Sequence, residues 1–179
     1  MSEFLLNRYK FGIFFAGPLI VFMLAIFQSG RYEIWIFVPL SLLWISLAWE
    51  DTNCLSVSLA KLVVTCVATI LCSSLIIESF DTIKLVAYHL FVIFTVVFLI
   101  NKISGKSAMG LADFWAIGAL SLTLSPSNIG LWIAVGCTLA LVPYSIGRIK
   151  KNKAVPFLPY LVISWMLVFS VNILQVPFL

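Results

Sequence analysis

Charged residues are scarce in this chain, since Asp, Glu, Lys and Arg make up 10% of its 179 residues. Soluble globular domains carry about 25% charged residues, so the composition excludes an ordinary water-soluble domain. Hydrophobic residues account for 63% of the sequence, and the mean hydropathy is +1.15. The composition therefore predicts an all-α, polytopic transmembrane helical bundle with little mass outside the bilayer. The net charge of +4 does not indicate a nucleic-acid partner, because the basic residues fall in short segments between apolar runs.

The sequence also lacks the patterns of a metal site or a disulfide framework. Its four cysteines, Cys54, Cys66, Cys72 and Cys137, form no Cys-x-x-Cys pair. The single histidine, His89, lies within an apolar run, and a metal centre would need several further ligands. We expect the cysteines to be structural residues and His89 to form a hydrogen bond between helices.

Apolar runs suited to crossing a bilayer recur along the whole chain. A transmembrane helix needs about 20 mainly apolar residues, with about 17 as the lower limit. The fifth run is short, and its helix could begin upstream, near Ser107. The seven predicted spans are Phe11–Phe27, Ile34–Trp49, Val57–Ile77, Leu85–Ile100, Gly110–Leu124, Gly130–Ile146 and Pro156–Phe178.

The basic residues outside these spans predict the orientation. Basic residues near span ends are concentrated on the cytoplasmic side of a membrane. The N-terminus and the second, fourth and sixth connections share one side, which carries Arg8, Lys10, Lys102, Lys106, Arg148, Lys150, Lys151 and Lys153. The opposite side carries only Arg31 and Lys84. We therefore predict a cytoplasmic N-terminus, a C-terminus outside, and a first span that is retained rather than cleaved.

Two acidic residues stand at span edges on the predicted cytoplasmic side. Asp51 follows Glu50 at the end of the second span, and Asp113 lies near the start of the fifth. An acid at the bilayer centre costs roughly 2.5–3.5 kcal/mol, and less near the interface, so such residues are functional candidates. Asp51 could instead be a solvated interfacial acid, and Asp113 could simply complement a helix dipole. Glu50 competes with Asp51 for a catalytic role.

Three stretches carry a more specific pattern. Ala48–Ser58 places an aspartate at the end of one span before a short polar entry into the next. The other two stretches are Met109–Asp113 and Val155–Leu161, the latter after a basic segment. Together they resemble the motifs of the type IV prepilin peptidases, the GxGD class of membrane aspartic proteases. The resemblance covers spans two to seven and is to the short form, which lacks the N-methyltransferase insert.

The first two stretches supply the aspartates of this resemblance. Asp51 matches the family's aspartate at the end of a span, and Ser58 stands where the family has a proline. Gly110, Ala112 and Asp113 match Gly-x-Gly-Asp, with alanine in place of the second glycine. The resemblance implies that Asp51 and Asp113 are the catalytic pair and that Gly110 and Ala112 support them.

The third stretch is the most specific string of the three. Pro156, Phe157 and Pro159 match the family's Pro-Phe-Gly-Pro at the start of its last span. Leu158 takes the place of the glycine. The resemblance implies that the two prolines and the phenylalanine support the site.

The family implies a function as well as a fold. Its members remove the basic leader of prepilins or pseudopilins at the cytoplasmic face of the inner (plasma) membrane, without a metal or cofactor. Two carboxylates sharing one proton can activate water and protonate the leaving amine. The resemblance divides the chain into an N-terminal transmembrane helix, residues 1–32, and a peptidase-like membrane core of six spans, residues 33–179. The expected partners are a prepilin or pseudopilin substrate and the lipid bilayer.

Two other functions stay open on the sequence. The substitutions at Ser58, Ala112 and Leu158 leave room for a catalytically inactive relative that acts in pilus or secretion assembly. In a small proton-coupled transporter, the two acids would carry protons. Transporters favour inverted repeats and broken helices near the midplane, whereas both acids here are predicted at one membrane face.

Overall fold

The regular structure of this chain is helical. The computed structural model describes residues 2–74, 80–104, 110–145 and 156–175, and within these ranges there is no strand. The described elements are α1 (Ser2–Ser29), the 3-10 helix η1 (Tyr32–Ile36), α2 (Phe37–Cys54), α3 (Leu59–Ser73), α4 (Phe80–Ser104), α5 (Leu111–Ser121), α6 (Pro126–Ser145) and α7 (Leu158–Gln175). The all-α prediction is confirmed for these residues.

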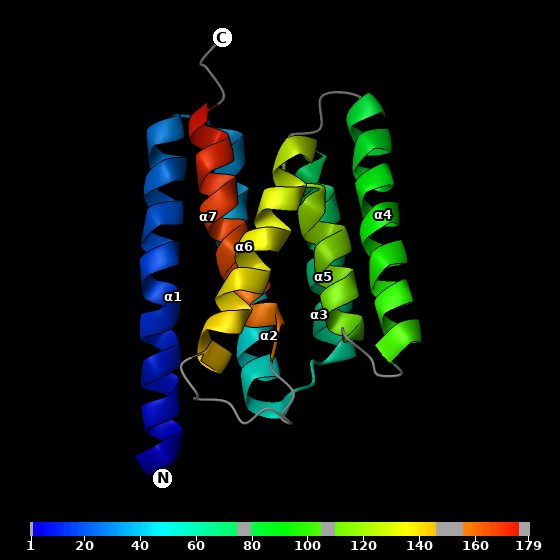
Figure 1. The fold of residues 1–179 in the computed structure, drawn as a ribbon. Helices are drawn as coiled ribbons and strands as arrows, with labels where there is room; N and C mark the ends of the chain where they lie inside the picture. Colours follow the sequence, from blue (N-terminus) through cyan, green and yellow to red (C-terminus); the bar gives the residue numbers. More distant parts are fainter. Residues whose placement is uncertain (1, 75–79, 105–109, 146–155, 176–179) are drawn as a thin grey trace.

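The helices run alternately up and down in one bundle (Figure 1). α7 packs against α1, α2, α5 and α6, so it is the central helix. α1 and α4 lie at opposite edges in Figure 1, and α4 contacts α5 and α6. A helix that is apolar all round is normally buried. α7 fits this rule, because its buried side chains include Leu161, Val162, Trp165, Met166 and Phe169.

Aromatic side chains join α1 and α2 to α7. The Phe22 ring, fully buried on α1, lies 5.4 Å from the Trp165 ring and 5.6 Å from the Phe169 ring, measured between centroids. Phe37, at the start of α2, lies 5.1 Å from Phe169 by the same measure. Aromatic pairs at such distances contribute about 0.5–1.5 kcal/mol beyond their buried area. The first helix therefore shares its core with the last.

A glycine allows α6 and α7 to approach closely. A Cβ added at Gly136 would lie 3.0 Å from Ser164 Oγ and 3.6 Å from the Tyr160 carbonyl oxygen. Nearby, Trp132 Nε1 of α6 donates a hydrogen bond of 2.9 Å to the Leu161 carbonyl of α7. Small residues of this kind permit tight helix contacts in apolar surroundings.

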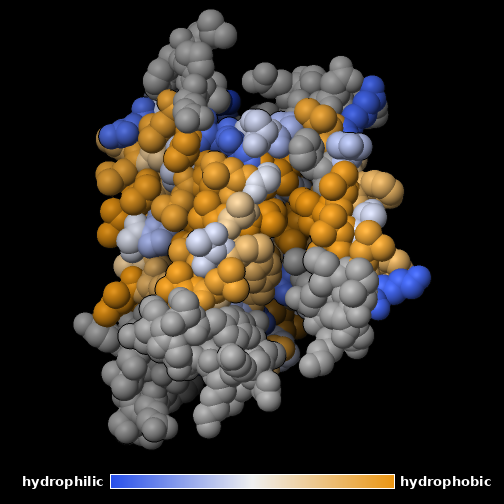
Figure 2. Space-filling view, viewed as in Figure 1, coloured by the Kyte–Doolittle hydropathy of each residue, from blue (hydrophilic) through white to orange (hydrophobic). Residues whose placement is uncertain are grey.

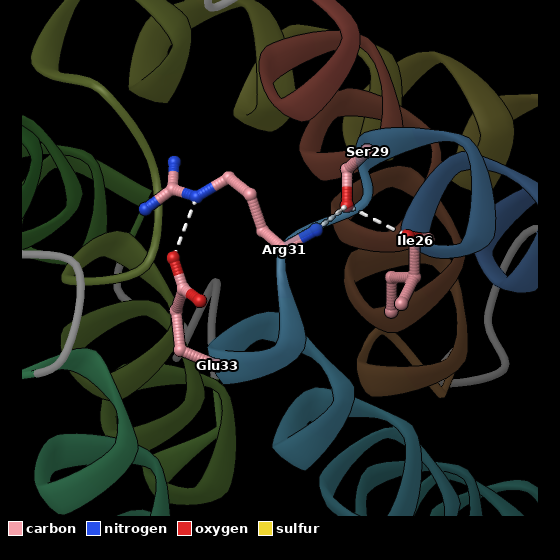
Figure 3. A network of polar contacts seen from close by, with 4 residues as sticks. All are labelled: Ile26, Ser29, Arg31 and Glu33. Carbon is pink, nitrogen blue, oxygen red and sulfur yellow. Dashed lines mark hydrogen bonds and ion pairs between the residues drawn. The ribbon is translucent and has the colours of Figure 1, made fainter. Parts of the chain in front are cut away.

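Local polar contacts fix the reversal between α1 and α2 (Figure 3). Ser29 Oγ donates to the Ile26 carbonyl at 2.6 Å and accepts the Arg31 N–H at 3.3 Å. Gly30, at φ 64°, turns the chain in the left-handed region that glycine adopts easily. Arg31 Nε then pairs with Glu33 Oε1 at 2.8 Å. Arg31 is one of the two basic residues predicted to lie on the non-cytoplasmic side of the membrane.

The surface of the described part is strongly apolar. Two helical segments, Phe11–Ser29 and Tyr32–Cys54, are long and apolar enough to cross a membrane. Figure 2 shows hydrophobic residues across the middle of one face, with hydrophilic residues gathered toward its upper end. The shorter apolar helices are Leu59–Ser73, Ile83–Leu99, Pro126–Val142 and Leu158–Leu174.

The helix ends differ from the predicted span ends at two points near the acids. α2 continues to Cys54, so Asp51 lies within the helix rather than just after it. α5 begins at Leu111 and not upstream, because Gly110 is extended at φ −74° and ψ 156°. α5 has 11 residues, about 16 Å at 1.5 Å per residue, against a hydrocarbon core of about 30 Å.

Some sequence predictions fall outside the described residues. They include the basic segment 148–153 and the end of the last predicted span, 176–178. The side chain of His89 also lies outside them, although its backbone is part of α4.

Candidate active site

The three stretches that the sequence singled out meet at one end of the bundle. The end of α2, the start of α5 and the start of α7 lie toward the lower end in Figure 1, where α1 also begins. A hydrogen bond joins the first stretch to the third, and an electrostatic interaction joins the first to the second. The site is therefore built from segments far apart in the sequence.

Asp51 is half-buried in the last turn of α2 and is held by the start of α7. Its Oδ2 accepts a hydrogen bond of 3.2 Å from the backbone N–H of Leu158. Leu158 is the first residue of α7, and the first N–H groups of a helix have no partner within it. The positive end of the helix dipole also favours a carboxylate there. The start of α7 thus positions Asp51.

The residues around Leu158 shape this helix start. The Phe157 carbonyl accepts the N–H groups of Tyr160 and Leu161, at 3.1 and 3.2 Å, and so closes the first turn. Pro159 follows Leu158 as the second helical residue, where a missing N–H breaks no helical hydrogen bond. The hydrogen bond to Asp51 comes from the backbone, so leucine at position 158 can donate it as well as glycine could.

Asp113 is the third residue of α5 and is 8% exposed. Its Oδ2 accepts the backbone N–H of Gly110 at 3.1 Å, which ties the carboxylate to the residue that caps its own helix. This is the side-chain-to-cap half of a capping box. Asp113 therefore lies in the first turn of a helix, where an acid complements the helix dipole, and it is also buried.

The two carboxylates lie close enough for their charges to interact. Each accepts a backbone N–H at a different helix start, Asp51 at α7 and Asp113 at α5. A carboxylate ionises less readily when a second carboxylate lies near it, so such a pair can hold one proton. The arrangement could supply both a general base and a general acid.

Within the stretch that matches Gly-x-Gly-Asp, Gly110 has little room for a side chain, whereas Ala112 has an ordinary helical backbone. A Cβ added at Gly110 would lie 3.2 Å from Asp113 Oδ2, closer than most real Cβ contacts. Ala112 lies in the first turn of α5, and its φ is not positive. Alanine therefore meets no backbone strain at position 112, and a glycine would gain nothing from its conformational freedom there.

Glu50 and Asp51 have different partners. Its carboxylate forms an ion pair with Lys61 of α3, and Glu50 Oε2 accepts the Ser58 N–H at 3.1 Å. Neither contact is predicted by the sequence motifs, and neither is the hydrogen bond from the Leu158 N–H to Asp51. An acid and a base on either side of a short helix connection are a signal that could have indicated the ion pair.

The described residues hold no cluster of three or more His, Cys, Asp or Glu side chains placed for a metal. All four cysteines are free thiols, with Cys66 buried and Cys72 half-buried. Cys54 and Cys137 are exposed. Cys54 lies in the last turn of α2, three residues after Asp51.

Comparison with protein-family models, with curated proteins and with solved structures finds no match. The resemblance to the prepilin peptidases therefore depends on the three sequence stretches. What the structure adds is the spatial relation of these stretches to one another.

Proposed function

We propose that this protein is a membrane aspartic endopeptidase that removes the basic leader from a prepilin or pseudopilin. The observation that carries the proposal is that the end of α2, which carries Asp51, and the start of α5, which carries Asp113, lie at the same end of an apolar helical bundle, with an electrostatic interaction between the two carboxylates. The third motif supports the same site, because the start of α7 holds Asp51 through Leu158.

The proposed reaction is hydrolysis of a peptide bond by a pair that shares one proton. The ionised carboxylate takes a proton from water as the water attacks the carbonyl carbon. The protonated carboxylate polarises the carbonyl oxygen and then supplies the proton to the leaving amine. The pair titrates as a unit, so each step belongs to Asp51 and Asp113 together.

An apolar groove borders α5, the helix that carries Asp113, and could take apolar side chains of a substrate segment. The groove has a volume of about 610 Å³, and Phe114, the residue after Asp113, is part of its lining. Its lining comes from α3, α4 and α5, namely Cys66, Ile70, Phe94, Phe114, Trp115, Gly118 and Ala119.

The proposed membrane arrangement gives a testable topology. The acids lie at the end of the bundle where α1 begins, which the basic residues assign to the cytoplasm. We expect a reporter fused after Leu179 to be active outside the cytoplasm and one fused before Met1 to be active inside. Cytoplasmic activity of the C-terminal fusion would contradict seven spans.

The test of the activity is co-expression with candidate prepilins in cells that lack their own prepilin peptidase. The proposal predicts a smaller prepilin on a gel in the presence of this protein. Unprocessed prepilin in every combination, with the protein present in the membrane, would favour the catalytically inactive relative.

Gly110→Ala is expected to lower prepilin cleavage on the order of tenfold, because the added methyl would push against Asp113 Oδ2, 3.2 Å away. Gly130→Ala in α6 is the control, since its added Cβ would meet no atom within 4 Å and Gly130 does not line the groove. Cleavage rates of membrane-inserted variants provide the measurement. Equal rates for the two variants would show that Gly110 does not position the carboxylate.

A further inference from the structure

The acid next to Asp51 joins two helices. Glu50 lies in α2, and its carboxylate contacts both the first residues of α3 and the connection before them. One oxygen pairs with the Lys61 ammonium group, and the other accepts the Ser58 N–H at 3.1 Å. Glu50 therefore binds the incoming helix at two points.

The connection that Glu50 holds is short and has an unfavourable backbone conformation. α2 ends at Cys54, and α3 begins at Leu59. Leu55 has φ 52°, in the left-handed region that a branched side chain rarely adopts. The Leu55 N–H donates to the backbone carbonyl of Asp51 at 2.9 Å, so the turn is hydrogen-bonded to the residue proposed as catalytic. The contacts of Glu50 with Ser58 and Lys61 help to offset the cost of this conformation.

We propose that Glu50 and Lys61 form a latch across this turn that sets the position of Asp51 against the start of α7. Glu50 is then a positioning residue, which acts through the turn and not on the substrate. This inference rests on the proposed peptidase function for its effect on cleavage, whereas the latch itself is a property of the turn.

The other role for Glu50 is to bind the basic leader of the substrate. The two roles differ in what they require of Lys61. A latch needs Lys61, so its loss lowers cleavage. A leader-binding acid would be released when Lys61 is removed, so the loss of Lys61 would tighten binding of a basic leader and lower the KM.

The experiment compares Glu50→Gln, Lys61→Met and Lys61→Arg in membrane-inserted protein. We expect the first two to lower kcat about fivefold with little change in KM, the scale of a partly exposed ion pair. Lys61→Arg keeps the positive charge and should retain most of the rate. Glu33→Gln removes the Arg31 partner at the other end of the bundle, and it should leave cleavage unchanged.

Amide hydrogen exchange supplies a readout that does not depend on cleavage. The latch predicts faster exchange of the Leu55 and Ser58 amides in Glu50→Gln and Lys61→Met than in wild type or Lys61→Arg. Unchanged exchange in both variants would overturn the latch, and so would a lower KM in Lys61→Met. If wild-type protein cleaves no prepilin, the proposed function fails, and the exchange rates still decide whether the latch exists.

Discussion

Replacing either aspartate with asparagine is expected to abolish leader removal while the protein still inserts and accumulates. Asparagine keeps the shape of Asp51 or Asp113 but cannot ionise, so the pair loses either its base or its acid. General acid–base groups contribute about 10²–10⁴-fold to rates, and a loss of this size leaves no visible product on a gel. Neither variant should be rescued by the remaining aspartate, because both steps need a pair that shares one proton.

Glu50→Gln is the matched control for these variants, because it also replaces an acid in the last turns of α2 with its amide. It should retain about a fifth of the wild-type rate, which still gives visible product, in keeping with its contacts to Lys61 and Ser58. Normal processing by Asp51→Asn or Asp113→Asn would rule out the assigned pair. Loss of processing in Glu50→Gln with normal processing in Asp51→Asn would move the first catalytic position by one residue.

Trp165→Ala is expected to lower the free energy of unfolding more than any other variant proposed for this protein. Trp165 is fully buried in the central helix, packs against Phe22 and Phe169, and donates from Nε1 to Thr123 Oγ1 at 2.7 Å. Truncating a buried tryptophan to alanine typically costs about 3–5 kcal/mol. Denaturant titration of the purified protein should show this loss in the free energy of unfolding.

Trp115→Ala serves as the control for the same change of residue type. Trp115 lies on α5 and is 53% exposed, so its truncation leaves no comparable internal cavity. It should lower the free energy of unfolding by much less than Trp165→Ala does. Equal losses for the two variants would contradict a core centred on α7.

Hydrophobic runs were enough to predict the all-α fold and the order of the helices. They could not fix the helix ends next to the acids. The polar residues after Trp49 end the apolar run, but the helix continues to Cys54, and the Thr52 and Asn53 side chains donate to the Ala48 and Trp49 carbonyls within it. At the other acid, the extended backbone of Gly110 starts the helix at Leu111, one residue after the start of the apolar run and not near Ser107.

The sequence motifs predicted those parts of the candidate site that depend on the identity of a side chain. The sequence pointed to Asp51, Asp113 and the start of the last helix, and these segments lie together. The bond between Asp51 and Leu158 could not be foreseen, since it uses a backbone N–H that any non-proline residue offers. The pairing of Glu50 with Lys61 depends on the turn at Leu55, whose left-handed conformation no local sequence signal predicts.

Cleavage of a defined substrate by the purified protein tests the central claim most directly. The protein would be reconstituted in lipid vesicles with a synthetic prepilin segment that carries a basic leader and an apolar helix. Mass spectrometry would then locate any cut. The account predicts two products cut at the junction of leader and helix with wild type, and none with Asp113→Asn. An intact segment with wild type, or the same cut with Asp113→Asn, would contradict it.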